Sequence, residues 1–304
     1  MAESEKITNA LTIDVEDWIQ SVYDVDAPLT ECFVRNTNTL LELLAAHDVR
    51  ATFFVLGLAA EKAPELVRAI HAAGHEVQSH GYGHRLIHTQ TPAQFREDVR
   101  KSKQLLEDLI GEPITGYRAP AFSITRRTLW ALDELVNVGF RYDSSIFPVR
   151  MRRYGISGLP RTPYRIATPG GNSLIEFPVC SLKLGPCHLP AGGGGYFRTA
   201  PYWYSRAAIR RMNHSGDPAV LYLHPYELAP NEWSELSQPI PLRTRFQQGL
   251  GRGSITEKLR RLLSEFQFAA LGELIPQLSL ELASTDAVAV DSCQTPPHPV
   301  FIPA

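Results

Sequence analysis

The stretch His75-Glu-Val-Gln-Ser-His80-Gly-Tyr-Gly-His84 begins with a short apolar run and contains, at the end of that run, two histidines four positions apart. The run predicts a β-strand, and the glycines between the histidines let the following loop turn both imidazoles toward one point. Neutral imidazole is the most common protein ligand of divalent transition metals. His80 and His84 are therefore candidate metal ligands at the end of a strand.

Acidic residues end a second predicted strand. In Leu11-Thr-Ile-Asp14-Val-Glu16-Asp17, an apolar run leads into Asp14, Glu16 and Asp17. Two histidines and one carboxylate leave a coordination position open for water, which is the arrangement of a catalytic metal site. Taken alone, each pattern has a plainer interpretation, since most histidines are structural and a short acidic segment can end a strand or cap a helix. Their occurrence beside two further patterns favours the metal site.

The two further patterns place an arginine and a histidine at the ends of other strands. Arg118, in Tyr117-Arg118-Ala-Pro120, can bind a carboxylate through two parallel hydrogen bonds, although a surface arginine in a loop is the alternative. His224 follows the continuous apolar run 220–223, which predicts a fully buried strand. An ionisable group at the end of such a strand is a candidate general acid or base.

Predicted strands alternate with predicted helices along the first half of the chain. The strands cover residues 7–13, 51–56, 75–80, 114–117 and 140–143, and the helices cover residues 38–47, 64–73, 92–110 and 125–138. Repeated β-α units imply a parallel sheet, with the candidate residues at the carboxyl ends of its strands. An open doubly wound sheet would also place a site there. Because the motifs are spread over several strands, an α/β fold of the (β/α) barrel type is favoured.

The four patterns, in this order and spacing, resemble the polysaccharide deacetylases that share the NodB homology domain, also called carbohydrate esterase family four. The resemblance extends by motif from residue 8 to about residue 230. It implies a (β/α) barrel that is distorted or has seven strands. The glycine-rich segment 192–197 and the segment 251–263 are similar to the exosortase (PEP-CTERM)-associated branch, which acts in exopolysaccharide synthesis.

The resemblance assigns the metal ligands and the general base. His80 and His84 match the two metal histidines, and Asp14 matches the base. The family's usual form has two adjacent aspartates, whereas this chain has Asp14-Val-Glu16-Asp17. The resemblance points to Glu16 as the carboxylate ligand, and Asp17 remains the alternative.

The resemblance also assigns the residues that assist the base and the leaving group. Arg118 would orient the base, and His224 would be the general acid. Asp143 would tune that histidine, and the backbone N–H of Ala121 would face the oxyanion. Gly81 departs from the family, which usually has serine or threonine after the first histidine, so the metal loop must be held differently here.

The resemblance implies hydrolysis of N-acetyl groups on amino sugars of a polysaccharide or its lipid-linked precursor. The cofactor would be a divalent metal, zinc first, with cobalt, nickel or manganese as alternatives. Peripheral contact with membrane-bound exopolysaccharide machinery is a further expectation. Two other functions stay open: hydrolysis of a small cyclic amide, as in allantoinases and imidases, and glycan binding without catalysis. Intact Asp14 and His224 weigh against a pure binding protein.

Composition and the two ends of the chain restrict the remaining possibilities. The formal net charge of −2 argues against nucleic acid or an anionic membrane surface as the main partner. The first residues lack the apolar core of a signal peptide, and no apolar run reaches about 18 residues, so we expect a cytoplasmic protein without a transmembrane helix. We expect one domain over residues 1–283, with an insert at 150–200 over the barrel mouth, an extension at 230–283 and a flexible tail at 284–304.

Overall fold

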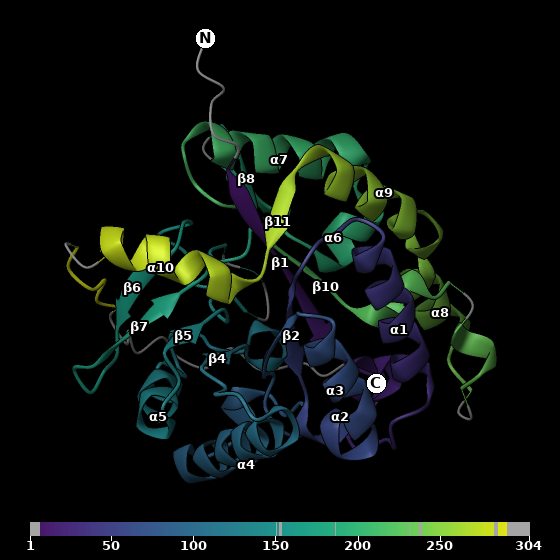
Figure 1. The fold of residues 1–304 in the computed structure, drawn as a ribbon, viewed down its shortest axis with the longest axis horizontal. Helices are drawn as coiled ribbons and strands as arrows, with labels where there is room; N and C mark the ends of the chain where they lie inside the picture. Colours follow the sequence, from purple (N-terminus) through teal and green to yellow (C-terminus); the bar gives the residue numbers. More distant parts are fainter. Residues whose placement is uncertain are drawn as a thin grey trace.

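A curled, mostly parallel β-sheet forms the centre of the molecule (Figure 1). The computed structural model describes residues 7–290 except 150, 152, 153, 186, 231, 237, 238, 283 and 284. Within this described part the sheet has nine strands. From one edge to the other they are β10 (Val220–Leu223), β1 (Thr8–Val15), β2 (Thr52–Val55), β3 (Glu76–Ser79), β4 (Gly116–Tyr117), β5 (Tyr142–Asp143), β7 (Ser173–Glu176) and β6 (Tyr164–Ala167), and β11 (Gln267–Ala269) also pairs with β1.

The pairing of the strands explains why continuous apolar runs form this sheet. Every pairing in it is parallel except the antiparallel one between β7 and β6. Parallel sheets are covered on both faces, so their strands are apolar on both sides. Phe53 and Phe54, which point to opposite faces of β2, are both inaccessible to solvent. The strands predicted in the first half of the chain are confirmed, with shorter bounds for β4 and β5.

Helices cover the outside of the curled sheet (Figure 1). In the first half of the chain they are α1 (Cys32–Ala45), α2 (Gly57–Lys62), α3 (Pro64–Ala72), α4 (Pro92–Ile110) and α5 (Trp130–Val138). α4 begins at the capping box in which Thr91 and Gln94 bond each other, and it ends at the left-handed Gly111. α5 begins later than the predicted residue 125, because the Thr128 hydroxyl accepts the Thr125 amide and forms a separate turn.

The second half of the chain returns to the same sheet. It contains the hairpin β8 (Ser181–Leu184) and β9 (Cys187–Pro190), followed by α6 (Gly194–Thr199), α7 (Tyr202–His214), α8 (Leu242–Gly249), α9 (Arg252–Glu265) and α10 (Leu271–Leu282). Residues 164–176 extend the sheet, where an insert over the barrel mouth was expected. Beyond β7 the chain links β5 to β10, since the Phe177 amide donates to the Asp143 carbonyl and the Cys180 amide donates to the Val220 carbonyl.

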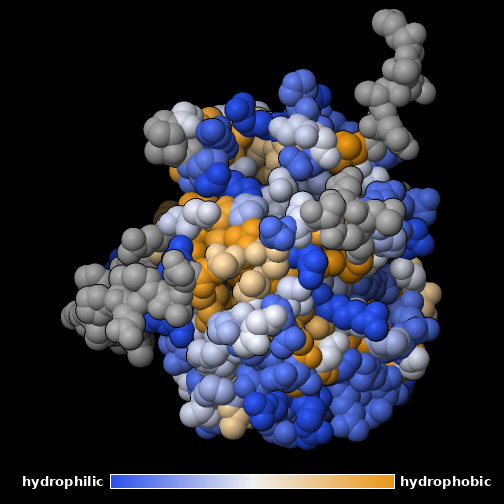
Figure 2. Space-filling view, turned by 90° about the vertical axis from the view of Figure 1, so that its left-hand side faces the viewer, coloured by the Kyte–Doolittle hydropathy of each residue, from blue (hydrophilic) through white to orange (hydrophobic). Residues whose placement is uncertain are grey.

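The surface of the molecule is unevenly polar. In Figure 2 hydrophobic residues gather midway up the face, at the height of α10, β6 and β7 in Figure 1, and the surface below them is mainly hydrophilic. Among the described residues, no helix is both long enough and apolar enough to cross a membrane.

Candidate active site

The four sequence patterns meet at the carboxyl ends of neighbouring strands. Asp14 lies near the end of β1 with Glu16 just beyond it, and His80, Arg118 and His224 directly follow β3, β4 and β10. Parallel strands bring their carboxyl ends to one edge of the sheet, so motifs far apart in the sequence become neighbours. The first four of these residues are each at most 3% exposed, and His224 is partly exposed.

Glu16, His80 and His84 form a compact cluster of donor atoms. Oε1 of Glu16 lies 2.8 Å from Nε2 of His80 and 3.0 Å from Nε2 of His84. His80 donates from Nδ1 to the Arg118 carbonyl at 2.8 Å, so its Nε2 presents a lone pair to the carboxylate. Lone pairs that face one another at this distance need a proton or a cation between them. The donor set therefore fits a divalent metal ion.

The structure does not bring Asp17 into this cluster. One Asp17 oxygen accepts the Ile19 amide at 3.1 Å, and the other accepts both the amide and the hydroxyl of Thr30, at 2.7 and 2.5 Å. Asp17 therefore fixes the chain that follows β1. Of the two carboxylates that the sequence leaves open, Glu16 is the one beside the histidines.

Asp98, on α4, holds the metal loop in place of the serine or threonine that is usual in the family. Its carboxylate accepts the amides of Tyr82 at 2.9 Å and Gly83 at 3.4 Å. Gly81 has a φ of +77°, and a Cβ built on it would lie 2.9 Å from Oδ1 of Asp98. The missing side chain at position 81 thus gives the carboxylate room to reach the loop.

Arg118 holds Asp14 within the sheet. Its Nη1 donates to Oδ1 of Asp14 at 2.8 Å and to Oγ1 of Thr12 at 2.7 Å. The contact with Asp14 uses a single nitrogen, because Nε and Nη2 donate to the carbonyl and the hydroxyl of Ser144. The Phe54 ring lies 4.4 Å from the guanidinium carbon. A buried charge of this kind is stable because every side of it has a partner.

His224 lies between two carboxylates. Its Nε2 is 3.9 Å from Oδ2 of Asp14, and its Nδ1 is 3.2 Å from Oε2 of Glu227. The Tyr226 ring stacks on the imidazole with 4.8 Å between centroids. Burial alone would lower the pKa of His224, but the negative charges of Glu16, Glu227 and Asp14 raise it to about 9.

The pKa of Glu16 is shifted in the opposite direction to that of His224. Burial tends to raise the pKa of this carboxyl group, yet the facing imidazoles of His84, His224 and His80 hold it well below its usual value. Glu16 therefore stays ionised, as a metal ligand must be.

Asp143 does not reach His224, contrary to the expectation from the family. It accepts the Ser145 hydroxyl and lies opposite Glu176 in the register of β5 and β7. Burial and this second carboxyl group raise the pKa of Glu176 well above its usual value, and burial raises the pKa of Asp143 to about 6. Since the Ser145 hydroxyl also accepts the Ala119 amide at 2.7 Å, Asp143 supports the loop that carries Arg118.

Ala121 lies in the turn that follows Arg118. It is exposed and has a φ of +49°, and Phe122 has a φ of +52°. Two consecutive non-glycine residues in the left-handed region are costly, and such strain is found most often at functional sites. The aromatic rings of Phe147 and Tyr154 pack against Phe122 and hold this turn.

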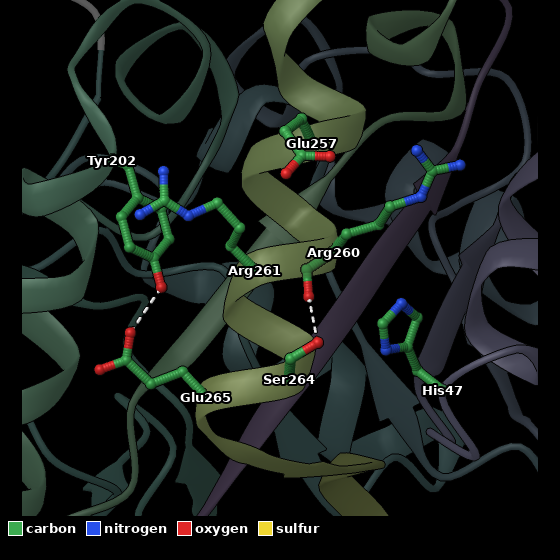
Figure 3. Close-up of a pocket in the computed structure, with 7 residues that line it drawn as sticks. All are labelled: His47, Tyr202, Glu257, Arg260, Arg261, Ser264 and Glu265. Atoms are coloured by element: carbon green, nitrogen blue, oxygen red, sulfur yellow. Dashed lines mark hydrogen bonds between the residues drawn. The ribbon is translucent and has the colours of Figure 1, made fainter.

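A separate pocket of about 610 Å³ lies apart from these residues (Figure 3). Within it the Tyr202 hydroxyl donates to Glu265 at 2.6 Å, and the Arg261 guanidinium lies 3.9 Å from the Tyr202 ring centroid. None of the residues that the four sequence patterns supply lines this pocket. It belongs to the outer surface formed by α7 and α9.

The sequence analysis did not predict some residues of the site. Of these, Glu227 is the one that its sequence position could have indicated, because it lies three positions after His224 and accepts the amide of that residue as a helix cap would. Asp98 stands in the middle of a helix, and Thr12 and Ser144 stand inside or beside strands. Nothing local marks these three, since their roles come from contacts across the sheet.

Comparison with known proteins agrees with this geometry. Residues 5–141 match the model of the polysaccharide deacetylase family, and residues 144–276 match a domain of unknown function, DUF3473. The first region of the chain therefore belongs to the polysaccharide deacetylase family. The two regions share one sheet, because β10 and β11 of the second region pair with β1 of the first.

The relatives match different shares of the chain. A peptidoglycan deacetylase of Helicobacter pylori is 36% identical over 107 residues, which are 35% of this chain and 36% of that protein. A chitooligosaccharide deacetylase of Rhizobium leguminosarum bv. trifolii is 27% identical over 168 residues, which are 54% of this chain and 74% of that protein. The chain thus spans about a third of the length of the first relative.

A solved structure supports the fold over the whole chain. A candidate polysaccharide deacetylase of Mycobacterium smegmatis superposes with a TM-score of 0.62 and 22% identity, covering 98% of this chain and 96% of that one. The curled parallel sheet with outer helices is thus the (β/α) barrel type of fold found in this family.

Proposed function

We propose that the protein removes N-acetyl groups from amino sugars of a polysaccharide or of its lipid-linked precursor, as a step of exopolysaccharide biosynthesis in the cytoplasm. One observation carries the proposal. Asp14 and His224, two groups able to transfer protons, lie 3.9 Å apart beside the cluster of Glu16, His80 and His84. Contact with membrane-bound exopolysaccharide machinery is part of the same proposal, as is the action of residues 1–283 as one catalytic domain.

The proposed metal ligands are Glu16, His80 and His84. Zinc suits two imidazoles and a carboxylate, and cobalt, nickel and manganese are the alternatives. When bound there, such an ion would supply Lewis acidity next to the scissile amide. Loss of bound metal from His80→Ala and His84→Ala variants, measured by elemental analysis, would support this ligand set.

The remaining residues would handle protons and charge. Asp14, oriented by its hydrogen bond from Arg118, would take the proton of the attacking water. His224, protonated at neutral pH because of its raised pKa, would donate a proton to the leaving amine. The Ala121 amide would donate a hydrogen bond to the developing oxyanion. The products would be acetate and a free amino sugar.

Acetate release by purified, metal-supplemented protein tests the proposal. The panel would hold acetylated oligosaccharides, lipid-linked acetylated sugars, and allantoin and an imide as cyclic amides. Release from a sugar substrate that is lost in Asp14→Asn would support deacetylation. Turnover of the cyclic amides alone would replace it with cyclic amide hydrolysis, and sugar binding without any turnover would indicate a binding protein.

A further inference from the structure

α8 (Leu242–Gly249) turns its apolar side chains away from the protein. Leu242 is 79% exposed, Phe246 71% and Leu250, at the end of the helix, 50%. Residues at these spacings lie on one face of a helix. Most surface helices bury their apolar face against the core, so this orientation is inverted. Large exposed apolar residues that lie together mark an interaction surface.

The backbone, and not the apolar face, attaches α8 to the protein. Two buried arginines donate to the carbonyl of Gln248 near the end of the helix, Arg198 at 2.7 Å and Arg252 at 2.9 Å. The side chains of α8 that turn inward are polar or small, and none of its residues is fully buried. The helix is thus held in a fixed orientation while its apolar face remains free.

α8 lies at the same end of the molecule as the candidate active site. A Cβ on Gly249 would lie 3.6 Å from the Trp233 ring, and Trp233 packs edge-on against Trp18 at 4.7 Å between centroids. Trp18 follows the acidic cluster of β1 and stacks on Tyr23, which is 42% exposed. The packed rings of Trp18 and Trp233 therefore connect the candidate active site to α8.

The charges around this face are positive. No acidic residue occurs between Glu235 and Glu257, and Arg243 and Arg245 both lie on α8. Among the described residues neither arginine forms an ion pair with an acidic side chain, and Arg243 is exposed while Arg245 is partly exposed. The whole chain carries a net charge of −2, and any attraction to an anionic surface is therefore local to this segment.

We propose that α8 docks the protein on an anionic lipid bilayer, with Leu242, Phe246 and Leu250 in the headgroup region. A helix of this length measures about 12 Å, and its few apolar side chains are far from the roughly 800 Å² per partner of a stable protein interface. A bilayer requires no complementary shape, and apolar side chains flanked by arginines suit its interface. Docking here would hold the candidate active site next to lipid-linked substrates, but it does not depend on the proposed activity.

Sedimentation of the full chain with lipid vesicles tests this proposal without any measurement of catalysis. We expect binding to vesicles of phosphatidylcholine with phosphatidylglycerol, and weaker binding to phosphatidylcholine alone. Phe246→Ser should lower the partition coefficient roughly tenfold or more, since one large apolar side chain is withdrawn. Replacing Arg243 and Arg245 by Gln should remove the preference for the anionic lipid, by roughly fivefold for each arginine.

Leu184→Ser is the matched control, because Leu184 is 50% exposed on β8, away from α8. It should bind vesicles as the unaltered chain does. Failure of the unaltered chain to bind anionic vesicles would overturn the proposal, as would unchanged binding by Phe246→Ser or equal loss in the control. Light scattering that shows a dimer dissociated by Phe246→Ser, without vesicle binding, would assign the face to a second copy and also overturn it.

Discussion

At the residue scale, the candidate active site consists of buried ionisable groups that each face a polar partner. Asp14 is paired with Arg118, and Glu16 faces two imidazoles. Burial makes the loss of one partner costly, because the remaining charge is left without solvent or counter-charge. His224 differs from the others, since it is partly exposed and its raised pKa depends on three surrounding carboxylates.

The two neighbouring acids Glu16 and Asp17 should separate metal binding from loop stability. Glu16→Gln should weaken metal affinity at least tenfold, because a neutral amide replaces an anionic ligand. Asp17→Asn should retain the metal but lower the melting temperature, since the bonds from Thr30 and Ile19 are weakened. Isothermal titration with zinc and thermal unfolding distinguish the two effects. Metal loss from Asp17→Asn alone would move the ligand to Asp17.

The proton donor can be tested through the pH profile of turnover. Because the pKa of His224 is raised to about 9 and the group must be protonated to act, activity should fall as the pH rises through that value. Glu227→Gln removes one of the anions that raise the pKa, so the alkaline limb should move to lower pH. Asp143→Asn is the control, because this residue does not contact His224, and its alkaline limb should stay in place.

The same shift also affects stability, with a definite sign. A histidine with a folded-state pKa above its unfolded value near 6.5 stabilises the fold fully below that value. The contribution is lost as the pH rises from about 6.5 through about 9. In Glu227→Gln this loss should be smaller, and unfolding by urea at several pH values measures it. An alkaline limb and a stability profile that are both unchanged in this variant would contradict the role of Glu227.

At the scale of single elements, the metal loop depends on α4. Asp98 sits on this helix and accepts the amides of Tyr82 and Gly83, which lie between the candidate metal ligands His80 and His84. Burial raises the pKa of Asp98, and the loop amides counteract this shift. The capping box and the left-handed Gly111 fix the two ends of α4, and the helix in turn positions the loop.

Gly81 and Asp98 should therefore behave as a coupled pair. Gly81→Ala forces a Cβ to within 2.9 Å of the Asp98 carboxylate at a φ of +77°, so it should weaken metal affinity about tenfold or more. In an Asp98→Ala background the same change should cost less, because only the backbone strain remains. Metal titrations of the single and double variants give the coupling energy.

Gly111→Ala is the matched control for this cycle. Gly111 has a φ of +73° with nothing within 4 Å of its built Cβ, so it carries the strain without the contact. It should lower stability by roughly 1 kcal/mol and leave metal affinity unchanged. Strictly additive effects of Gly81→Ala and Asp98→Ala would contradict the coupling.

At the scale of the whole molecule, one sheet joins two regions that match different family models. β1 carries Asp14 and leads into Glu16, and its neighbours β10 and β11 come from the region that matches DUF3473. That region also supplies His224, at the end of β10. The deacetylase region alone would lack a strand neighbour of β1 and the proposed acid.

A fragment of residues 1–143 should therefore not fold cooperatively. Removing β10 and β11 exposes the apolar edge of β1, including Leu11 and Ile13, which are fully buried in the whole chain. Circular dichroism during urea unfolding should show a broad transition for the fragment and a sharp one for the full chain. A cooperative transition in the fragment, with metal bound, would show that the deacetylase region is independent.

The sequence by itself determined the order of strands and helices in the first half of the chain, the resemblance to the deacetylases and the candidate donor residues. Hydrophobic periodicity and the residues that begin or end a helix are local properties of the sequence. The capping box at Thr91 and the buried strand before His224 could therefore be predicted from neighbours in the chain. The contacts that complete the site link residues distant in sequence. The tertiary structure alone decided three of these contacts, because the curled sheet brings the strand ends and α4 together. Glu16 faces the histidines while Asp17 binds Thr30, and Glu227, not Asp143, contacts His224. Asp98 occupies the space beside Gly81. The outward apolar face of α8 likewise follows from tertiary bonds, because the periodicity of a helix shows that it has an apolar face and not which way that face turns.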